Sequence, residues 1–357
     1  MTSRLKRSVK RAVITAGLET ARIAGAAGFG RSARGRGVIF TLHHVRPASR
    51  NDFAPNAHLE ITPEFLEAAI LQLTRDGYRF IALSELPQHL QSSIDERVAL
   101  FTLDDAYRNT LDHAAPVFAR YAVPFTVFVT KGFAERTHSV WWETLAVLLR
   151  SSEALTFDFG RGPARLSLRS AAAKQAAFDR FAAFVHGTNE ADAVARIDAL
   201  ARSEGIDPLA LAEALTLDEA GLAKLAADPL AELGGHTVSH RALGRLSDEA
   251  AAVEIDASLD HVARLIGRAP ANFAYPYGDA PAVSERTKAL LAERQLLAVT
   301  TKPGTLDRHC PSEALPRISL NGLYQKPAYV SALASGIPFL GSRRPAAQPA
   351  GGTIDQG

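Results

Sequence analysis

The chain has 357 residues, of which 47% are hydrophobic and 22% are charged, and its formal net charge is +2. This composition is typical of a globular protein that buries a full core, and it excludes a disordered or fibrous chain. Because Cys310 is the single cysteine, an intramolecular disulfide framework is excluded as well.

Residues 1–37 form a basic arm. Nine of them are Lys or Arg and one, Glu19, is acidic, so the arm carries about +8 and the rest of the chain about −6. Four apolar residues recur there at helical spacing: Leu5, Val9, Val13 and Ala16. The pattern leaves two interpretations open, a helix that lies on an anionic membrane surface and a solvated basic tail.

A cleaved signal peptide is the less favoured interpretation of this arm. The apolar run 12–18 is short and is followed at once by Glu19, and Arg22 precedes the small residues 24–26. No stretch of the sequence approaches the ~20 apolar residues that span a bilayer. We therefore expect a retained arm on a protein that is cytoplasmic or peripheral on the cytoplasmic membrane face, with export left open.

Strands and helices alternate from residue 38 to residue 130. The predicted strands are 38–44, 98–104 and 124–130, with a short additional strand at 79–83. One helix begins at Pro63 behind Thr62 and ends near Gly77, and a second covers 111–121. Short strands that alternate with helices are expected to pair in parallel.

The strand 98–104 stops at two adjacent carboxylates, Asp104 and Asp105. The carboxyl end of a strand is where α/β proteins place their chemistry, and neighbouring carboxylates are costly there unless a cation shares the site. The alternative is a turn whose aspartates cap the following helix.

The alternation is interrupted between residues 133 and 215. This stretch contains Trp141-Trp142-Glu143, a predicted hairpin of 155–159 and 164–168, and two Ala-rich helices at 170–186 and 189–203. It predicts an inserted lid. Trp141 and Trp142 have two interpretations, stacking on sugar rings beside the site or anchoring of the insertion to the barrel.

The alternation resumes after the insertion. A helix at 218–227 leads into the strand 231–235, and a longer helix keeps Ile255, Leu259, Val262 and Ile266 on one face. Three further strands are predicted at 272–277, 296–300 and 314–320. Seven principal parallel strands would close into a barrel, and the residues beyond 341 are expected to be disordered.

Two more polar motifs follow predicted strands. His236 and His240 have the i, i+4 spacing that lets both rings reach one ion across a single turn of helix. With one carboxylate they leave coordination positions open, as in a catalytic metal site. The stretch 274–278, Ala-Tyr-Pro-Tyr-Gly, ends the strand 272–277 in a stiff turn.

Taken in order, Thr-Leu-Asp-Asp, His-Thr-x-x-His and Phe-Ala-Tyr-Pro-Tyr-Gly resemble the first three motifs of the NodB-type polysaccharide deacetylases, carbohydrate esterase family 4. The resemblance covers roughly residues 38–107 and 215–325. It implies a distorted (β/α)7 barrel over residues 38–340, here with a helical insertion at 133–215, between the arm 1–37 and the tail 341–357.

The resemblance also implies roles for the motif residues. Asp104 would be the general base, and Asp105, His236 and His240 would hold a divalent metal, zinc first, with cobalt or nickel as substitutes. The backbone N–H of Tyr277 would stabilise the oxyanion. His44, matched to the family's N-terminal Tyr-His-x-Val element, is assigned as general acid.

One position departs from the family pattern. Many members begin the third motif with Arg, but this chain has Ala274 there, so Arg317 at the end of the last strand is the candidate to supply the charge. Ala274 keeps a non-catalytic alternative open, in which the chain binds glycans with a retained pocket.

The expected reaction is removal of N-acetyl groups from amino sugars of a poly- or oligosaccharide or a glycolipid. The nearer alternative is a deformylase that acts on a lipid-linked formamido sugar. The expected partners are the N-acetylated glycan or glycolipid and, through the basic arm, a membrane surface, but not nucleic acid, because no basic surface is interleaved with aromatic residues.

Overall fold

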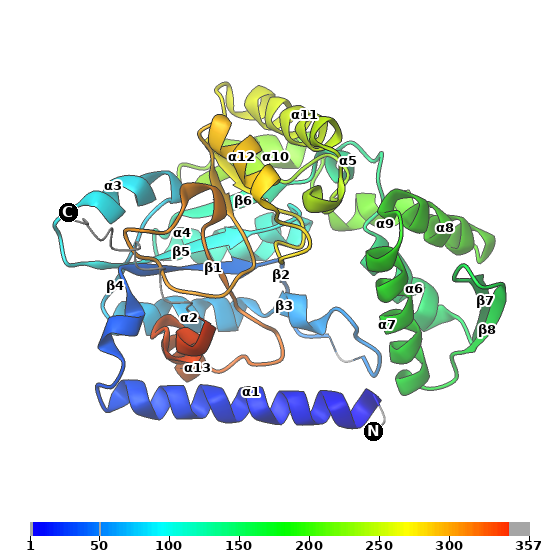
Figure 1. Cartoon of the computed structure of the whole chain (residues 1–357), viewed down its shortest axis with the longest axis horizontal. Coiled ribbons are helices and arrows are strands. Elements are labelled where there is room, and N and C mark those ends of the chain that lie inside the picture. The colour runs from blue at the N-terminus through cyan, green and yellow to red at the C-terminus, as the bar shows by residue number, and fades with distance from the viewer. Residues whose placement is uncertain (1–2, 50, 343–357) are drawn as a thin grey trace, which may run out of the picture.

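A curled parallel sheet forms the centre of the molecule in the computed structural model, which describes residues 3–49 and 51–342 (Figure 1). Its strands are β1 (Gly37–Leu42), β4 (Tyr78–Phe80), β5 (Arg97–Leu103), β6 (Phe125–Val129), β9 (Ala231–Gly235), β10 (Asn272–Ala274), β11 (Leu297–Val299) and β12 (Ile318–Ser319). The order is β11-β10-β9-β6-β5-β1-β12, and β4 pairs with β5.

The sheet nearly closes on itself. A parallel bridge between Val299 and Leu315 joins β11 to the segment that leads into β12. The predicted distorted barrel is confirmed, and its seven principal strands are the seven predicted ones. β10 is shorter than expected because the backbone turns after Ala274 and reaches a positive φ of 62° at Tyr277.

The strands are held in register by apolar residues that are buried on both faces of the sheet, as in other parallel sheets. Phe40 pairs with Phe101, and Phe101 pairs with Phe125. Leu42 likewise pairs with Leu103, so β1 and β5 end side by side. Whatever follows these two strands is therefore brought to one edge of the barrel.

Helices cover the outside of the sheet. They are α2 (Pro63–Arg75), α3 (Leu86–Gln91), α4 (Ala115–Arg120), α5 (Lys131–Ala134), α10 (Glu219–Ala226), α11 (Asp248–Ile266), α12 (Glu285–Glu293) and α13 (Pro327–Ala334). The predicted start of α2 is confirmed, since Thr62 Oγ1 accepts a hydrogen bond from Phe65 N at 3.1 Å. A small two-stranded sheet, β2 (His44–Val45) with β3 (Glu60–Ile61), lies beside β1.

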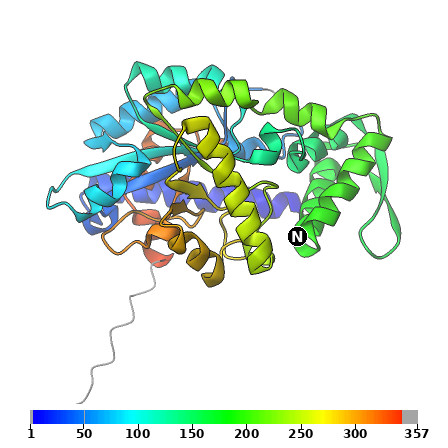
Figure 2. The same cartoon turned by 90° about the horizontal axis from the view of Figure 1, so that it is seen from above.

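The insertion is a helical unit at one end of the barrel (Figures 1 and 2). It comprises α6 (Trp141–Ser151), the hairpin of β7 (Ala154–Asp158) and β8 (Pro163–Ser167), α7 (Ala171–Gly187), α8 (Glu190–Ser203) and α9 (Pro208–Leu215). Phe157, Phe181 and Phe184 are among the buried residues of an apolar cluster that also includes Phe53 and Tyr107 of the barrel. The hairpin, α7 and α8 match the prediction within one residue, whereas α6 and α9 were not predicted.

The basic arm forms helix α1 (Ser3–Ala26), which runs along one flank of the barrel beside α13 (Figure 1). Leu18 and Ala21 are buried against Tyr329 of α13. Tyr329 also donates a hydrogen bond to Glu19 at 2.8 Å. The arm is therefore packed on the barrel from Ile14 onward, whereas residues 8–13 are exposed. This contradicts the interpretation of the whole arm as a solvated tail.

No helix within residues 3–49 and 51–342 combines the length and the apolar character that crossing a bilayer requires. Near the other end of the chain a 3₁₀ segment, η7 (Ile337–Ser342), packs on α1. Most of the tail that was predicted to be disordered, residues 343–357, lies outside the described residues.

Candidate active site

Three loops meet at the carboxyl edge of the barrel, after β5, after β9 and after β10. Eight non-glycine residues of the described chain have a positive φ, and five of them lie in these loops: Asp105, Ala106, Thr237, His240 and Tyr277. A positive φ is costly for a residue with a side chain and persists only where the surroundings enforce it. The concentration of positive-φ residues in these three loops indicates a functional site.

Asp105, His236 and His240 converge in the middle of this edge. Each offers a ligand atom within 4.8 Å of the others. Asp105 Oδ1 is 3.4 Å from His240 Nε2 and 3.7 Å from His236 Nε2. Both oxygens of Asp105 are buried and accept no hydrogen bond from the described residues. A buried carboxylate that accepts no hydrogen bond is energetically costly. Two imidazoles and one carboxylate fit a divalent ion such as zinc.

The loop after β9 orients both histidines. His236 Nδ1 lies 2.7 Å from the carbonyl oxygen of Ala274, which can only accept, so the proton is on Nδ1 and Nε2 faces Asp105. Glu254 of α11 accepts from the backbone N–H groups of Val238 and Ser239 at 2.8 and 2.9 Å. The two histidines thus lie on a loop held by a carboxylate, and the expected turn of helix is wrong.

Asp104 forms a buried ion pair with Arg317. Arg317 donates from both terminal nitrogens to the two carboxylate oxygens, at 2.7 and 2.8 Å. It also donates to Thr102 Oγ1 and to the carbonyl of Thr300, so its position is fixed from three sides. Burial alone would raise the pKa of Asp104, but the guanidinium of Arg317 outweighs burial and holds that pKa well below its usual range.

The pKa of the adjacent carboxyl group, Asp105, is shifted in the opposite direction. Burial, followed by repulsion from Asp104, raises the pKa of Asp105 well above the ordinary value of an aspartate. Burial also lowers the pKa of His240 well below 6.5. Two neighbouring aspartates therefore have environments that push their pKa values apart, which is the pattern of groups with different roles.

The two histidines after β1 are placed the other way round from the prediction. His43 Nε2 is 3.9 Å from Asp104 Oδ2, on the side to which Thr41 also points. Alternate residues of an extended chain share a face, so His43 follows Thr41 toward the site and His44 turns away. Burial, with Arg317 next among the groups that act in the same direction, lowers the pKa of His43 to about 4 although Asp104 opposes the shift.

His44 is fully buried behind the site. Its ring lies tilted against that of Tyr107, with 3.6 Å between ring centroids, and Asn109 Nδ2 donates to its Nδ1 at 2.8 Å. Its Nε2 is 3.6 Å from Glu143 Oε1. The expected orientation of His44 is therefore wrong. The sequence held the signal, because Tyr-His-x-Val laid on residues 42–45 puts His43 at the histidine position.

Tyr277 joins the barrel to the insertion. Its hydroxyl donates to Glu190 Oε1 at 2.6 Å and accepts from Trp141 Nε1 at 3.0 Å. Its ring lies 5.0 Å from that of His240. Its backbone N–H donates to none of the residues in 3–49 and 51–342, so the donor assigned to the oxyanion is free of protein partners.

Both tryptophans are buried, with 6% and 7% of their surface exposed, so neither offers an open ring face to a sugar. Trp142 Nε1 donates to Tyr107 OH at 3.0 Å, as Trp141 does to Tyr277. Their contacts favour the second interpretation, in which they anchor the insertion to the barrel.

Sequence reasoning missed four polar residues that support the site: Asn109, Glu143, Glu190 and Glu254. Glu143 could have been noticed, since it follows the two tryptophans directly. Asn109, Glu190 and Glu254 carry no local signal, because each acts on residues that are distant in the sequence or on a different element.

Comparisons with known proteins agree with this architecture. Solved structures that resemble the chain include a Streptococcus pyogenes deacetylase, PplD, in complex with acetate, at 17% identity and a TM-score of 0.53, covering 80% of this chain and 92% of that one. IcaB from Ammonifex degensii follows at 16% identity and a TM-score of 0.52, covering 84% and 97%. A polysaccharide deacetylase from Bacillus cereus, BC0361, has 13% identity and a TM-score of 0.52, covering 84% and 68%.

At these identities the structural similarity shows a shared fold. No curated protein matches the sequence. The family described as polysaccharide deacetylase, in contrast, matches residues 91–296, which is more than half of the chain and includes all three loops of the site. The chain belongs to the polysaccharide deacetylase family and is a hydrolase of the carbohydrate N-deacetylase class.

Proposed function

We propose that the protein removes N-acetyl groups from amino sugars of a glycan or glycolipid in a reaction that requires a divalent metal. The observation that carries the proposal is the convergence of Asp105, His236 and His240 beside the Asp104–Arg317 ion pair. A divalent ion bound by the first three residues would act as a Lewis acid toward the amide carbonyl and the attacking water. Zinc is the first choice, with cobalt or nickel as substitutes.

Asp104 is the proposed general base. Arg317 keeps it ionised and fixes both of its oxygens, so the carboxylate is ready to take a proton from water. The same ion pair limits its basicity, because a carboxylate with a low pKa is a weak base. Removal of a proton from water therefore depends on the water being acidified within the site.

The backbone N–H of Tyr277 is the proposed donor to the oxyanion that forms when water adds to the amide carbon. Its freedom from protein partners supports this role. The hydrogen bonds that Glu190 and Trp141 make to the Tyr277 hydroxyl restrict the turn that carries this N–H. No step requires the hydroxyl itself to react.

Collapse of the oxyanion expels an amine, which leaves only after it is protonated. We assign the proton delivery to His43 rather than to His44. His43 is uncharged at neutral pH, so it has to receive a proton before it can donate one, and Asp104 at 3.9 Å is the group that supplies it. The water proton thus passes from Asp104 through His43 to the amine, and the products are acetate and a free amino sugar.

One other reaction remains as an alternative. A deformylase would use the same groups on a smaller acyl substituent, so the two reactions differ only in the pocket for the acyl group. A non-catalytic glycan-binding protein is disfavoured, because binding requires neither an ionised, arginine-paired Asp104 nor three metal-ligating side chains at one point.

The deciding experiment compares two neighbouring substitutions. Asp105→Ala should remove bound zinc together with turnover, whereas Asp104→Asn should keep zinc and lose turnover on N-acetylated oligosaccharides. Zinc content is measured by inductively coupled plasma mass spectrometry, and turnover is measured as amine release. Near-normal turnover by Asp104→Asn would remove the assigned base, and turnover by a metal-stripped protein would remove the metal from the reaction. Parallel assays with N-formyl and N-acetyl substrates would identify the acyl group.

We further propose that α1 lies on the cytoplasmic face of a membrane with anionic lipids. Lys10, Arg11 and Arg22 are exposed on this helix, and a basic amphipathic helix is attracted to such a surface. A membrane location would bring the protein to glycolipid substrates.

A further inference from the structure

The insertion touches the loops that follow most of the barrel strands, at the end of the barrel where the active site lies (Figures 1 and 2). After β1, Asn56 Nδ2 donates to the carbonyl oxygen of Trp142 at 3.2 Å. After β5, the hydroxyl of Tyr107 accepts from the Trp142 indole at 3.0 Å. The insertion itself starts in the loop after β6. Three neighbouring strands are therefore followed by loops that carry or contact it.

Glu190, at the start of α8, joins the insertion to two more loops. One of its oxygens accepts from the backbone N–H of Ala242, after β9, at 3.1 Å, and the other accepts from the Tyr277 hydroxyl, after β10, at 2.6 Å. The strands β10, β9, β6, β5 and β1 are consecutive in the sheet. Within the described chain, no hydrogen bond, ion pair or ring contact joins the insertion to residues 300–302 or 320–325, which follow β11 and β12. The insertion thus walls one continuous arc of the site and leaves one open side, at β11 and β12.

The walled side has no room for a second sugar ring beside the proposed metal ligands. The ring of His240 lies 4.8 Å from that of Trp142 and 5.0 Å from that of Tyr277, measured between centroids. Rings at separations of about 4.5–7 Å are in direct contact. A glycan therefore cannot continue from the reacting sugar toward the insertion.

Solvent reaches the site from the open side. His43 exposes 20% of its side chain, whereas the side chains of Asp104, Asp105, His236 and His240 expose at most 9%. His43 follows β1, and the next strand beyond β1 is β12. The most accessible polar group of the site is therefore the one that borders the open side.

Ser319 marks where β12 meets the solvent. The parallel register pairs Ser319 with Thr41, whose side chain points at Asp104, so both residues belong to the inner face of the barrel. Arg317, two residues earlier on the same face, is buried against Asp104. Ser319 is exposed. The inner face of the barrel is thus closed at Arg317 and open at Ser319.

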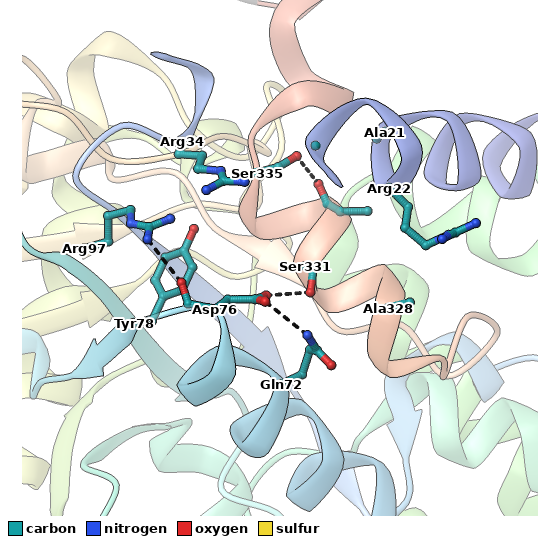
Figure 3. A pocket seen from close by; sticks show the side chains of 12 residues that line it. Ala21, Arg22, Arg34, Gln72, Asp76, Tyr78, Arg97, Ala328, Ser331 and Ser335 are labelled. Atoms are coloured by element: carbon teal, nitrogen blue, oxygen red, sulfur yellow. Dashed lines mark hydrogen bonds between the residues drawn. The ribbon is translucent and has the colours of Figure 1, made fainter. Parts of the chain in front are cut away.

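A cavity on the flank of the barrel does not extend the site. It has a volume of about 360 Å³ and lies between α1, α2 and α13 (Figure 3). Tyr78 and Arg97 of its lining are the first residues of β4 and β5, so the cavity lies at the amino edge of the sheet. The active site follows the carboxyl end of β5, about 20 Å away along the strand. A glycan longer than one sugar must therefore leave over the open side.

We propose that the protein deacetylates the amino sugar at one end of its glycan, and that the rest of the substrate leaves over the loops after β11 and β12. A sugar within a chain has a neighbour on each side, and a site walled over five consecutive loops has an exit for only one of them. Lys302 and Asn321 lie in these two loops and can hydrogen-bond to sugar hydroxyls. The inference rests on the proposed deacetylation and names the position in the glycan on which it acts.

The first test maps the free amines that the zinc-loaded protein produces on pentamers of N-acetylglucosamine. Two pentamers are used, one (1→4)-linked and one (1→6)-linked. The products are labelled at the reducing end and sequenced by tandem mass spectrometry. One free amine in each chain, at a terminal sugar, is expected even after prolonged incubation. Free amines at interior sugars would overturn the proposal.

The second test narrows the open side. Ser319→Trp places an indole where the second sugar would lie and should raise the KM for the pentamer roughly tenfold. The KM for monomeric N-acetylglucosamine should not change, because the monomer has no second ring. Arg245→Trp places the same indole on the walled side, at the exposed end of η5 (Leu243–Arg245), and should change neither KM. Equal effects of the two substitutions on the pentamer would contradict the assigned exit.

A third measurement does not depend on turnover. Saturation-transfer difference NMR with the zinc-loaded protein reports which sugar protons of the pentamer lie against the protein. The strongest signals are expected from one terminal sugar. Equal signals along the chain, or no signals, would overturn the one-sided site. Failure to release acetate from any substrate would instead contradict the proposed deacetylation, and the NMR result would still decide where the glycan lies.

Discussion

The active site has two walls of different origin. The barrel wall carries Asp104, Asp105 and His236, each directly after a strand whose neighbours are in parallel register. The insertion wall carries Trp141 and Glu190, whose side chains reach Tyr277 from α6 and α8, and Trp141 belongs to an apolar cluster in which Tyr107 of the barrel also takes part. The first wall supplies groups that react, and the second supplies groups that position Tyr277.

The two walls also differ in how much free energy is lost when one of their interactions is removed. The barrel wall depends on buried charges, and removing one partner of such a pair leaves the other uncompensated, at a cost of about 3–5 kcal/mol. The insertion wall depends on hydrogen bonds between tryptophans and tyrosines, which contribute about 1 kcal/mol each. Substitutions in the first wall should therefore have large effects, and substitutions in the second should produce graded ones.

The largest effect is expected for Arg317→Ala. Arg317 is 1% exposed and satisfies both oxygens of Asp104, so its loss should lower the unfolding free energy by about 3–5 kcal/mol. Turnover should fall with it, because Asp104 would no longer be held in position. Denaturant unfolding and amine release are the measurements.

Ala274 offers a way to sharpen this result. Many relatives carry an arginine at that place in the third motif, and Ala274 shares a buried cluster with Phe128, over whose ring Arg317 lies. Adding Ala274→Arg to Arg317→Ala should restore part of the lost activity. Full activity of Arg317→Ala alone would contradict the role of the ion pair.

The next largest effect separates the two histidines. His43→Ala should reduce kcat by roughly 10²- to 10⁴-fold, as expected for a group that transfers a proton, with zinc content unchanged. His44→Ala should act mainly on stability, since it opens a cavity against Tyr107 and removes the partner of Asn109. A large loss of kcat with normal stability in His44→Ala would restore the original assignment.

These histidines show what the sequence can and cannot predict. The strand that precedes them, its place in the barrel and the three loops were predictable, because apolar runs and their polar ends follow from burial and strand geometry. The choice between neighbours depends on which side chain turns inward after Leu42, where β1 ends and the chain bends before β2. Alternation counted from Thr41 gives the right answer only once Thr41 is known to face Asp104.

Glu254 illustrates a second limit. Nothing in a helix sequence marks a glutamate that will accept hydrogen bonds from a loop some fifteen residues earlier. Its contribution follows from tertiary packing of α11 on the end of β9. The motifs therefore predicted that Asp105, His236 and His240, the proposed metal ligands, lie together, whereas nothing predicted the group that holds the histidine loop.

Glu254→Gln should weaken zinc binding by roughly 10- to 100-fold, the usual effect of a residue that orients metal ligands. Val238 N and Ser239 N both donate to Oε2, and Arg241 donates to Oε1, so the amide nitrogen of glutamine would face N–H donors at whichever of the two positions it takes. Chelator competition at neutral pH measures the change. Glu249→Gln, an exposed glutamate on the same helix, is the matched control and should bind zinc normally.

The same residue predicts a dependence of stability on pH. Burial would raise the pKa of Glu254, but hydrogen bonds from Ser239 and Arg241 outweigh it and lower the pKa below 4.5. A lowered pKa in the fold stabilises the protein above the unfolded value and loses that effect as the pH falls through the folded value. The stability gap between wild type and Glu254→Gln should therefore narrow on acidification below about pH 4.5. A constant gap would contradict the role of the charge.

The smallest effect is expected in the insertion wall, for Trp141→Phe. Phenylalanine keeps an aromatic ring against Trp142 and Phe178 but cannot donate to Tyr277 OH. Loss of a single hydrogen bond of about 1 kcal/mol corresponds to a decrease in the reaction rate of roughly fivefold. Because the Tyr277 N–H is needed only when the oxyanion forms, the decrease should occur in kcat, with KM and zinc content unchanged. Trp142→Phe, which breaks the equivalent bond to Tyr107, is the control for a general loosening of the insertion. If both substitutions lower kcat equally, the insertion acts as a rigid cover; if Trp141→Phe alone does so, it acts through Tyr277.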